Sequence, residues 1–353
     1  MSNLRAVCLY GPKDIRVVEV NEPKPDFGEV VIKVKAASIC GTDMHYYRGE
    51  AFPVKLPIII GHEYSGVVVE VGEGVKNIAK GDRVIGPPYV GCGRCHYCLS
   101  GRHQLCLNRL AFGVNIDGCM AEYVKIPMAD VALCKLPNEL TFEEGALIGD
   151  MFSTAFHCIE RAEIRAGDVV VIFGTGPIGL STALIVNMSG VSRVVAVDCR
   201  DEALNNAGKL GISSTINIEK EDVAEKVRKL TNGLGADIAI DAAGAQETLK
   251  SAIGCLKMGG RLVIEAVFTN LPKINLKKVT MGELEIHGSL CPADIKNLNR
   301  VITFIKLRQI DLKPLITHRF DLSSAPQAFE IIQNKVGNPI KIILTTETIS
   351  STN

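Results

Sequence analysis

Two hydrophobic patterns divide the chain near residue 150. The first part consists of short apolar runs interrupted by glycine and proline, which is typical of β-strands. The runs that we predict as strands there are Arg16–Val20, Glu29–Ala36, Ser65–Val71 and Arg83–Ile85. From residue 142 the apolar spacing becomes helical, as Leu147, Phe152 and Phe156 illustrate. We therefore expect a mostly antiparallel, barrel-like first domain that ends in a helix.

After Asp168, continuous apolar strands alternate with helical stretches. The predicted strands are Val169–Phe173, Arg193–Val197, Ile238–Asp241, Arg261–Ala266 and Glu285–Gly288. Because strands of this kind are buried on both faces, the alternation predicts a doubly wound parallel sheet in an α/β protein. A helix near Pro326–Asn334 and a strand near Ile340–Leu344 are expected to return to the first domain. The expected domains are residues 1–151, completed by 291–353, and residues 152–290.

A glycine-rich motif follows the first strand of the second pattern. Its residues are Gly174, Thr175, Gly176, Pro177, Ile178 and Gly179. It opens a helix predicted over Gly179–Ser189, and Asp198 ends the next strand 19 residues after Gly179. This is the context that a dinucleotide-binding fingerprint requires. The glycines let the backbone approach a pyrophosphate, and the helix N-terminus adds partial positive charge.

Asp198 and Arg200 bear on the choice of dinucleotide. Asp198 would accept hydrogen bonds from the ribose hydroxyls and would repel a 2′-phosphate, which favours NAD. Arg200 leaves NADP open, because an arginine near this position could accept that phosphate. A glycine turn in an α/β fold without nucleotide is the alternative to both.

Charge and composition exclude some classes of protein. With 39 basic and 39 acidic residues the net charge is zero, which argues against a nucleic-acid partner. Val169–Ser192 is uncharged and long enough to span a membrane, but its glycine motif favours a strand, a turn and a helix. The start of the sequence reads as leaderless. The twelve cysteines then predict a reducing compartment, the cytoplasm. The interpretation of Val169–Ser192 as a strand, a turn and a helix predicts no membrane partner.

Four cysteines form the most specific pattern in the chain: Cys92, Cys95, Cys98 and Cys106. Four thiolates on one short loop can close a tetrahedron around a structural zinc ion. Glycines interrupt this loop and it has little apolar content, so a metal would be needed to order it. Two disulfides or free thiols are the alternative. His96 and His103 interleave the cysteines and are not expected to be ligands.

A second group of metal-binding side chains lies between residues 40 and 63. Cys40, His62 and Glu63 offer sulfur, nitrogen and oxygen ligands, and a catalytic zinc needs three ligands and an open position. The residues around His62 carry the resemblance that follows: Gly61-His62-Glu63-x2-Gly66-x5-Gly72-x2-Val75. This run matches the zinc signature of the medium-chain dehydrogenase/reductase superfamily. The chain resembles that superfamily over essentially its whole length.

The resemblance implies a GroES-like catalytic domain, a Rossmann cofactor domain and two zinc ions per chain. It implies that Cys40, His62 and Asp150 hold the catalytic zinc, with Glu63 as a ligand that exchanges with water or substrate. Other members carry Cys or Glu where this chain has Asp150, and Asp resembles secondary-alcohol and some L-threonine 3-dehydrogenases. A capping or surface carboxylate is the alternative for Asp150.

Three further residues receive roles from the same resemblance. Thr42 falls where the family places the hydroxyl that bonds the substrate oxygen, and His45 matches a proton-relay histidine. Asp43 would hold His62 in one tautomer. Each role has turn chemistry as its alternative. The family also implies a homotetramer or a dimer, with the interface around Val263–Phe268 and Glu285–Leu290.

The substrate follows from the resemblance only as a class. Ile39–His45 and Gly61–Tyr64 resemble L-threonine 3-dehydrogenase, Met151–His157 is nearer the secondary-alcohol type, and Pro314–Phe320 resembles polyol dehydrogenases. We predict an NAD-linked dehydrogenase of a simple, diol or polyol secondary alcohol. L-Threonine 3-dehydrogenase is the alternative, and a non-catalytic, zinc- and nucleotide-binding redox sensor is a remote second one.

Overall fold

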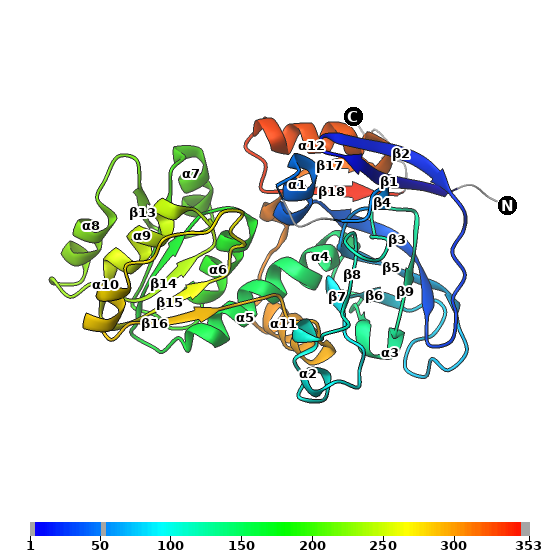
Figure 1. The fold of residues 1–353 in the computed structure, drawn as a ribbon, viewed down its shortest axis with the longest axis horizontal. Helices are drawn as coiled ribbons and strands as arrows, with labels where there is room; N and C mark the ends of the chain where they lie inside the picture. Colours follow the sequence, from blue (N-terminus) through cyan, green and yellow to red (C-terminus); the bar gives the residue numbers. More distant parts are fainter. Residues whose placement is uncertain (1–3, 51–53, 347–353) are drawn as a thin grey trace. The chain divides into compact units, whose positions relative to one another are not determined.

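The computed structural model describes residues 4–50 and 54–346, so the prediction about the start of the sequence falls partly on residues 1–3, which lie outside the described residues. The chain forms two compact units, one of residues 1–153 with 291–353 and one of residues 154–290 (Figure 1). No described helix is both long enough and apolar enough to cross a membrane.

The first unit is built mainly of antiparallel strands. Its largest sheet has the order β10-β6-β5-β3-β18-β17, with β9 also on β3, and only β17 and β18 are parallel. A three-stranded sheet has the order β2-β1-β4, and β7 pairs with β8. The strands are β1 (Leu4–Gly11), β2 (Asp14–Val20), β3 (Val30–Ser38), β4 (Ile58–Ile59), β5 (Glu63–Val71), β6 (Arg83–Ile85), β7 (Tyr89–Val90), β8 (Leu110–Ala111), β9 (Tyr123–Ile126), β10 (Cys134–Lys135), β17 (Ile316–Asp321) and β18 (Lys341–Thr345).

The first unit also contains helices between these strands in the sequence. They are α1 (Gly41–Arg48), α2 (His96–Leu99), α3 (Ala129–Ala132), α4 (Phe142–Leu147), α11 (Ile295–Arg308) and α12 (Ala325–Asn334). The core beneath the sheets includes Val30, Tyr64 and Phe329, none of which is exposed. The helical run predicted from residue 142 is interrupted by one π-helical turn, Ile148–Phe152. Such turns occur often at functional sites.

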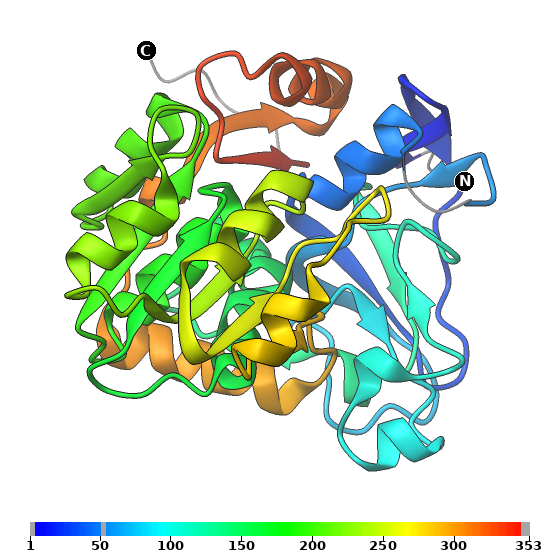
Figure 2. The same ribbon diagram turned by 60° about the vertical axis from the view of Figure 1, so that its left-hand side comes forward.

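The second unit is a parallel sheet with the order β13-β12-β11-β14-β15-β16. Figure 2 shows this unit, coloured green to yellow, from a second side. Its strands are β11 (Val169–Phe173), β12 (Arg193–Asp198), β13 (Ser214–Asn217), β14 (Ala236–Asp241), β15 (Leu256–Ile264) and β16 (Glu285–Gly288). Its helices are α5 (Ser153–Ala162), α6 (Pro177–Asn187), α7 (Asp201–Lys209), α8 (Val223–Leu230), α9 (Gln246–Cys255) and α10 (Leu276–Met281).

The order of this sheet confirms the predicted doubly wound fold. Successive strands are added on one side of β11 up to β13 and on its other side from β14 onward. Such sheets bind ligands at this switch point, at the carboxyl ends of their strands. Several boundaries differ from the prediction, for example in β15 and α6. β15 ends at Ile264 rather than Ala266, and α6 begins at Pro177 rather than Gly179, because proline with its fixed φ is favoured in the first helical turn.

Candidate active site and metal centres

Four predicted ligands converge in the first unit. Cys40 precedes α1, His62 and Glu63 lie at the start of β5, and Asp150 lies in the π-helical turn. One ligand atom of each lies within 4.8 Å of the others, and all four residues are buried. Sulfur, nitrogen and oxygen donors at this spacing suit zinc.

Asp43 orients two members of this group. Its carboxylate accepts a hydrogen bond from the backbone N–H of Cys40 at 2.8 Å, and it lies 3.4 Å from Nδ1 of His62. The other ring nitrogen of His62, Nε2, lies 3.4 Å from Asp150. An imidazole held through one nitrogen presents the other to a metal, which is the arrangement that metal-binding histidines use.

The two carboxylate oxygens of Glu63 have different surroundings. Its Oε2 accepts hydrogen bonds from Ser38 and Lys341, and the exposed fraction of the Lys341 side chain is 1%. Its Oε1 has no hydrogen-bond partner among the described residues, although Glu63 is fully buried. A buried carboxylate oxygen without a donor is costly, so this atom is free to meet a cation.

The electrostatics of the cluster also fit a divalent cation. Burial, Glu63 and Asp150 together raise the pKa of the Cys40 thiol. Burial opposes ionisation of Asp150, but hydrogen bonding and charge from His62 lower its pKa overall. Burial likewise raises the pKa of Glu63, although Lys341 acts against it. Burial and the neighbouring carboxylates thus work against ionisation of Cys40 and Glu63, and a bound Zn²⁺ would offset this by stabilising the ionised forms of its ligands.

Thr42 and His45 lie on α1 beside this cluster. The Thr42 hydroxyl is 3.9 Å from the Cys40 sulfur. Nδ1 of His45 is 3.3 Å from Glu50, and about a third of the His45 side chain is exposed. Thr42 therefore lies next to the ligands, and His45 lies toward solvent on the same helix.

The four clustered cysteines form a second group that could hold a metal ion. Their sulfurs lie within 4.8 Å of one another, and Cys95 is 3.5 Å from Cys98 and 3.8 Å from Cys106. Tetrahedral thiolates around zinc are about 3.8 Å apart. All four are free rather than disulfide-bonded, and the backbone N–H of Cys98 lowers the pKa of Cys95 to about 6. The predicted non-ligand His96 is exposed and lies against Tyr97.

Loss of one of these thiolates is expected to release a single zinc ion. Cys95→Ser should bind zinc at the four-cysteine site about 100-fold more weakly, because a ligand is removed from a closed shell. Metal analysis after dialysis should find one zinc per chain in place of the two that the two ligand groups predict. The control is Cys199→Ser, an exposed cysteine outside both groups. Full zinc content in Cys95→Ser would contradict the assignment.

The glycine motif of the second unit has the shape that a pyrophosphate requires. Gly174 has φ +91°, which favours glycine, and a Cβ on Gly179 would lie 1.9 Å from the carbonyl oxygen of Gly174. A Cβ on Gly176 would meet nothing within 4 Å. Open space at the N-cap of α6, which Gly176 provides, is where an anionic group binds a helix N-terminus. The residues therefore fit a dinucleotide.

Asp198 is held in place by its neighbours. One carboxylate oxygen accepts hydrogen bonds from the backbone and hydroxyl of Thr175, both at 2.9 Å, and the other accepts from the backbone N–H of Arg200 at 3.0 Å. The Arg200 guanidinium lies 3.6 Å from the same carboxylate. Arg200 thus lies beside Asp198, the residue predicted to disfavour a 2′-phosphate.

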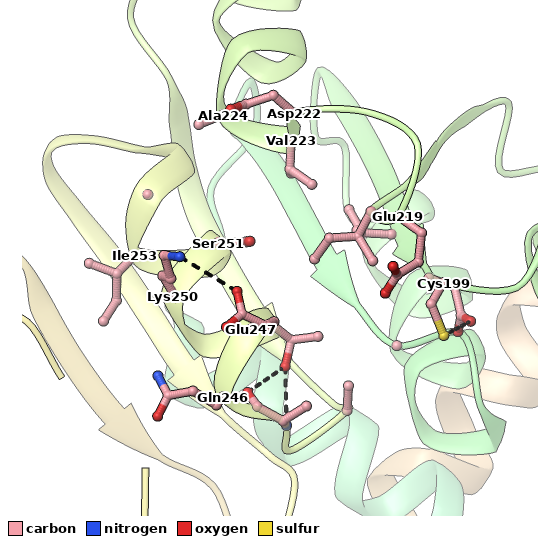
Figure 3. Close-up of a pocket in the computed structure, with 18 of the residues that line it drawn as sticks. Cys199, Glu219, Asp222, Val223, Ala224, Gln246, Glu247, Lys250, Ser251 and Ile253 are labelled. Atoms are coloured by element: carbon pink, nitrogen blue, oxygen red, sulfur yellow. Dashed lines mark hydrogen bonds and ion pairs between the residues drawn. The ribbon is translucent and has the colours of Figure 1, made fainter. Parts of the chain in front are cut away.

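A cavity of about 1010 Å³ opens beside Asp198. Figure 3 shows Cys199 and Glu219 on one side of it and Gln246, Glu247 and Lys250 on the other. Glu221 and Asp222 add further acidic groups to its lining. Lys250, Lys273 and Lys278 also line it, so the cavity carries charged groups of both signs.

Sequence reasoning missed several residues that the structure brings to these sites. The most important is Lys341, whose strand β18 lies beside β3, which in turn pairs with β5. The register joins Ser38 to Glu63 and Ile343 to Ser38, so the buried lysine reaches Glu63. A single lysine in the apolar run Ile340–Leu344 was the available signal.

Comparisons with known proteins agree with this geometry. Residues 26–138 match the alcohol dehydrogenase GroES-like domain, and residues 177–306 match the zinc-binding dehydrogenase family. The chain is 35% identical over 326 residues to L-threonine 3-dehydrogenase of Bacillus licheniformis, covering 91% of this chain and 92% of that protein. It is 32% identical over 333 residues to sorbitol dehydrogenase of Bacillus subtilis, covering 93% of each.

Solved structures give the same result. Alcohol dehydrogenase TADH from Thermus sp. ATN1 has a TM-score of 0.91 and 31% identity, and the match covers 97% of this chain and 100% of that one. The predicted GroES-like and Rossmann folds are therefore confirmed.

Proposed function

Because the chain belongs to the zinc-dependent medium-chain dehydrogenase/reductase superfamily, we propose that it interconverts a secondary alcohol and the ketone with NAD. The observation that carries this proposal is the buried group Cys40, His62, Glu63 and Asp150 in a chain that also has a dinucleotide site. A protein that only bound zinc and a nucleotide, without catalysis, would not need a second metal site with oxygen, nitrogen and sulfur ligands. The redox-sensor alternative is correspondingly weaker.

Cys40, His62 and Asp150 would hold the catalytic zinc, with Glu63 in exchange with water or substrate. When bound, zinc supplies a Lewis acid toward the alcohol oxygen. NAD supplies the hydride acceptor. Thr42 accepts the hydroxyl proton, which then leaves toward His45 and solvent. Asp43 keeps His62 in the tautomer that exposes Nε2.

The proposed substrate class is the common denominator of the relatives. These include an L-threonine 3-dehydrogenase and a sorbitol dehydrogenase, whose named substrates both contain a secondary alcohol. An enzyme for threonine must also bind an ammonium and a carboxylate. A simple, diol or polyol substrate does not require these two additional binding groups, so we propose a substrate of this kind. L-Threonine is the second candidate because of the relatives' names.

A substrate panel tests this function. Zinc-replete protein is mixed with NAD or NADP and with L-threonine, sorbitol, xylitol, 2,3-butanediol, 2-propanol or ethanol, and nicotinamide reduction is followed. Turnover of a secondary alcohol other than threonine supports the proposal. Turnover of L-threonine alone moves the assignment to the second candidate. NADH binding without turnover of any alcohol would favour the binding-only alternative.

The preference for NAD is expected to depend on Asp198. Asp198→Asn removes the charge that repels a 2′-phosphate, so the ratio of kcat/KM for NADP to that for NAD should rise at least about tenfold. Steady-state rates with both cofactors measure this ratio. Asp201→Asn, which removes an exposed carboxylate paired with Lys220, should leave it unchanged. An unaltered ratio in Asp198→Asn would remove Asp198 from cofactor selection.

Assembly and compartment are further parts of the proposal. β16 is an edge strand of the parallel sheet, so its free edge supports a homotetramer or dimer formed around Glu285–Leu290. All twelve cysteines are free, which supports a reducing compartment, the cytoplasm. Light scattering of the purified protein determines the oligomeric state.

A further inference from the structure

The carboxylate of Glu63 is held through only one of its two oxygens. Its Oε2 accepts hydrogen bonds from the Ser38 hydroxyl and from the Lys341 ammonium. The exposed fraction of each of these three residues is at most 1%. Oε1 has no hydrogen-bond partner among the described residues. The two donors thus fix one buried oxygen and leave the other for a different partner.

The Lys341 ammonium is itself fixed next to two of the predicted metal ligands. Besides Glu63, it donates to the carbonyl oxygen of Ile39 at 3.3 Å, and Ile39 directly precedes Cys40. The backbone N–H of Ile39 donates in turn to the carbonyl oxygen of Ile342 at 3.1 Å, which ties this segment to strand β18. Because protein interiors are close-packed, a buried side chain with these contacts has little freedom to move.

Glu63 also belongs to the buried ligand group. One of its carboxylate oxygens lies within 4.8 Å of a ligand atom of each of Cys40, His62 and Asp150. Since Oε2 already accepts from two donors, Oε1 is the oxygen that a metal ion would satisfy. Carboxylates bind metal ions through one oxygen or through both. The donors on Oε2 oppose binding through both oxygens, because that would move Oε2 away from them.

We propose that Lys341, together with Ser38, is a positioning residue that restricts Glu63 to binding the catalytic metal through one oxygen. This inference rests on the metal site of the proposed function. A catalytic zinc has three protein ligands and a fourth position that stays open to water or substrate. A carboxylate bound through both oxygens would occupy that position and would be difficult to displace. With Oε2 held, Glu63 can give way to the substrate.

Imidazole binding to the cobalt-loaded protein tests the proposal without substrate or cofactor. Cobalt replaces zinc in the catalytic site, and its visible absorption reports the type and geometry of its ligands. Imidazole is a neutral ligand that competes with Glu63 for the open position. In Lys341→Met the released carboxylate should hold that position, so the dissociation constant of imidazole should rise about tenfold. Ser38→Ala removes the other donor but keeps the charge of Lys341, and it should raise the constant as well. This second variant keeps the test available if Lys341→Met does not fold.

A double-mutant cycle separates this role from the charge of Lys341 and from its contribution to stability. In a Glu63→Gln background, Lys341→Met should leave the imidazole constant unchanged, because the competing carboxylate has been replaced by a weakly binding amide. An equal rise in both backgrounds, or no rise in either, would overturn the proposal. The control is Lys125→Met, which removes a half-exposed ammonium from Asp26 and Glu29 and should bind imidazole as the wild type does. A wild-type protein that binds no cobalt beyond the four-cysteine site would instead overturn the proposed function.

Discussion

Asp150→Ala is expected to lower kcat/KM for the alcohol about 1000-fold and to weaken zinc binding at the catalytic site. The carboxylate lies 3.4 Å from Nε2 of His62 and 3.6 Å from the sulfur of Cys40, inside the ligand group. Without the Asp150 carboxylate, the proposed zinc ligands are Cys40 and His62, together with the exchangeable Glu63. A catalytic metal contributes several kcal/mol to the transition state, and each 1.36 kcal/mol is tenfold in rate.

Steady-state kinetics and metal analysis of the same preparation check this expectation. Asp150→Cys restores a ligand of the type that other family members use, so it should bind zinc better than the alanine variant. Asp117→Ala, an exposed carboxylate of the same unit, is the control and should keep both zinc and activity. Full activity in Asp150→Ala would remove this residue from the catalytic centre.

Lys341→Met is expected to lower the free energy of unfolding by about 3–5 kcal/mol. The substitution leaves the Glu63 carboxylate fully buried without its cation, and breaking a buried pair costs far more than forming one contributes. Burial opposes the charge on Lys341, but Glu63 and Cys40 raise its pKa overall. The lysine therefore stays charged in the folded protein and balances the anionic ligands.

Urea unfolding at a fixed zinc concentration measures this change, because zinc binding itself stabilises the folded state. The matched control is Lys125→Met, which breaks a half-exposed pair with Asp26 and Glu29. Exposed pairs contribute less than about 1 kcal/mol, so this variant should unfold close to the wild type. Equal effects of the two substitutions would mean that burial of Lys341 carries no special cost.

The pH dependence of the Lys341 contribution has a definite sign. The pKa of Lys341 is raised in the folded state, so its pair with Glu63 contributes fully below the unfolded pKa of lysine. The contribution declines only as the pH rises through the higher folded value. Over the neutral range the difference between wild type and Lys341→Met should therefore stay nearly constant.

Much of the fold was accessible from local patterns. The apolar runs of the parallel sheet predicted four of its strands closely, because continuous hydrophobic segments between glycines report burial on both faces. The helix α11 was not predicted, and the π-helical turn at Asp150 was not either. For α11 a local signal was present, namely the N-cap Asp294 and the helical spacing of Leu298, Val301, Ile302 and Ile305. The π-helical turn carries no such local period.

The sequence by itself determined the chemistry of the sites. Spacing alone identifies the four cysteines of one metal site and the glycine motif, because these residues are close in the chain and meet through local loops. Cys40 and His62 were candidates from their residue types, but Asp150 and the joining of all three into one site came only through resemblance to a family, since residues this far apart carry no local signal of contact. Their roles as ligands remain predictions until the metal is measured.

Only the tertiary structure decided what surrounds those residues. Strand pairing brings Lys341 from the last strand to Glu63, nearly three hundred residues earlier in the chain, and leaves the other oxygen of Glu63 free. The same kind of long-range packing sets Glu265 between Thr182 and Cys158 at the edge of the sheet. The burial of these side chains and the pairing of opposite charges depend on segments that are distant in the sequence. No pattern of neighbouring residues therefore predicts them.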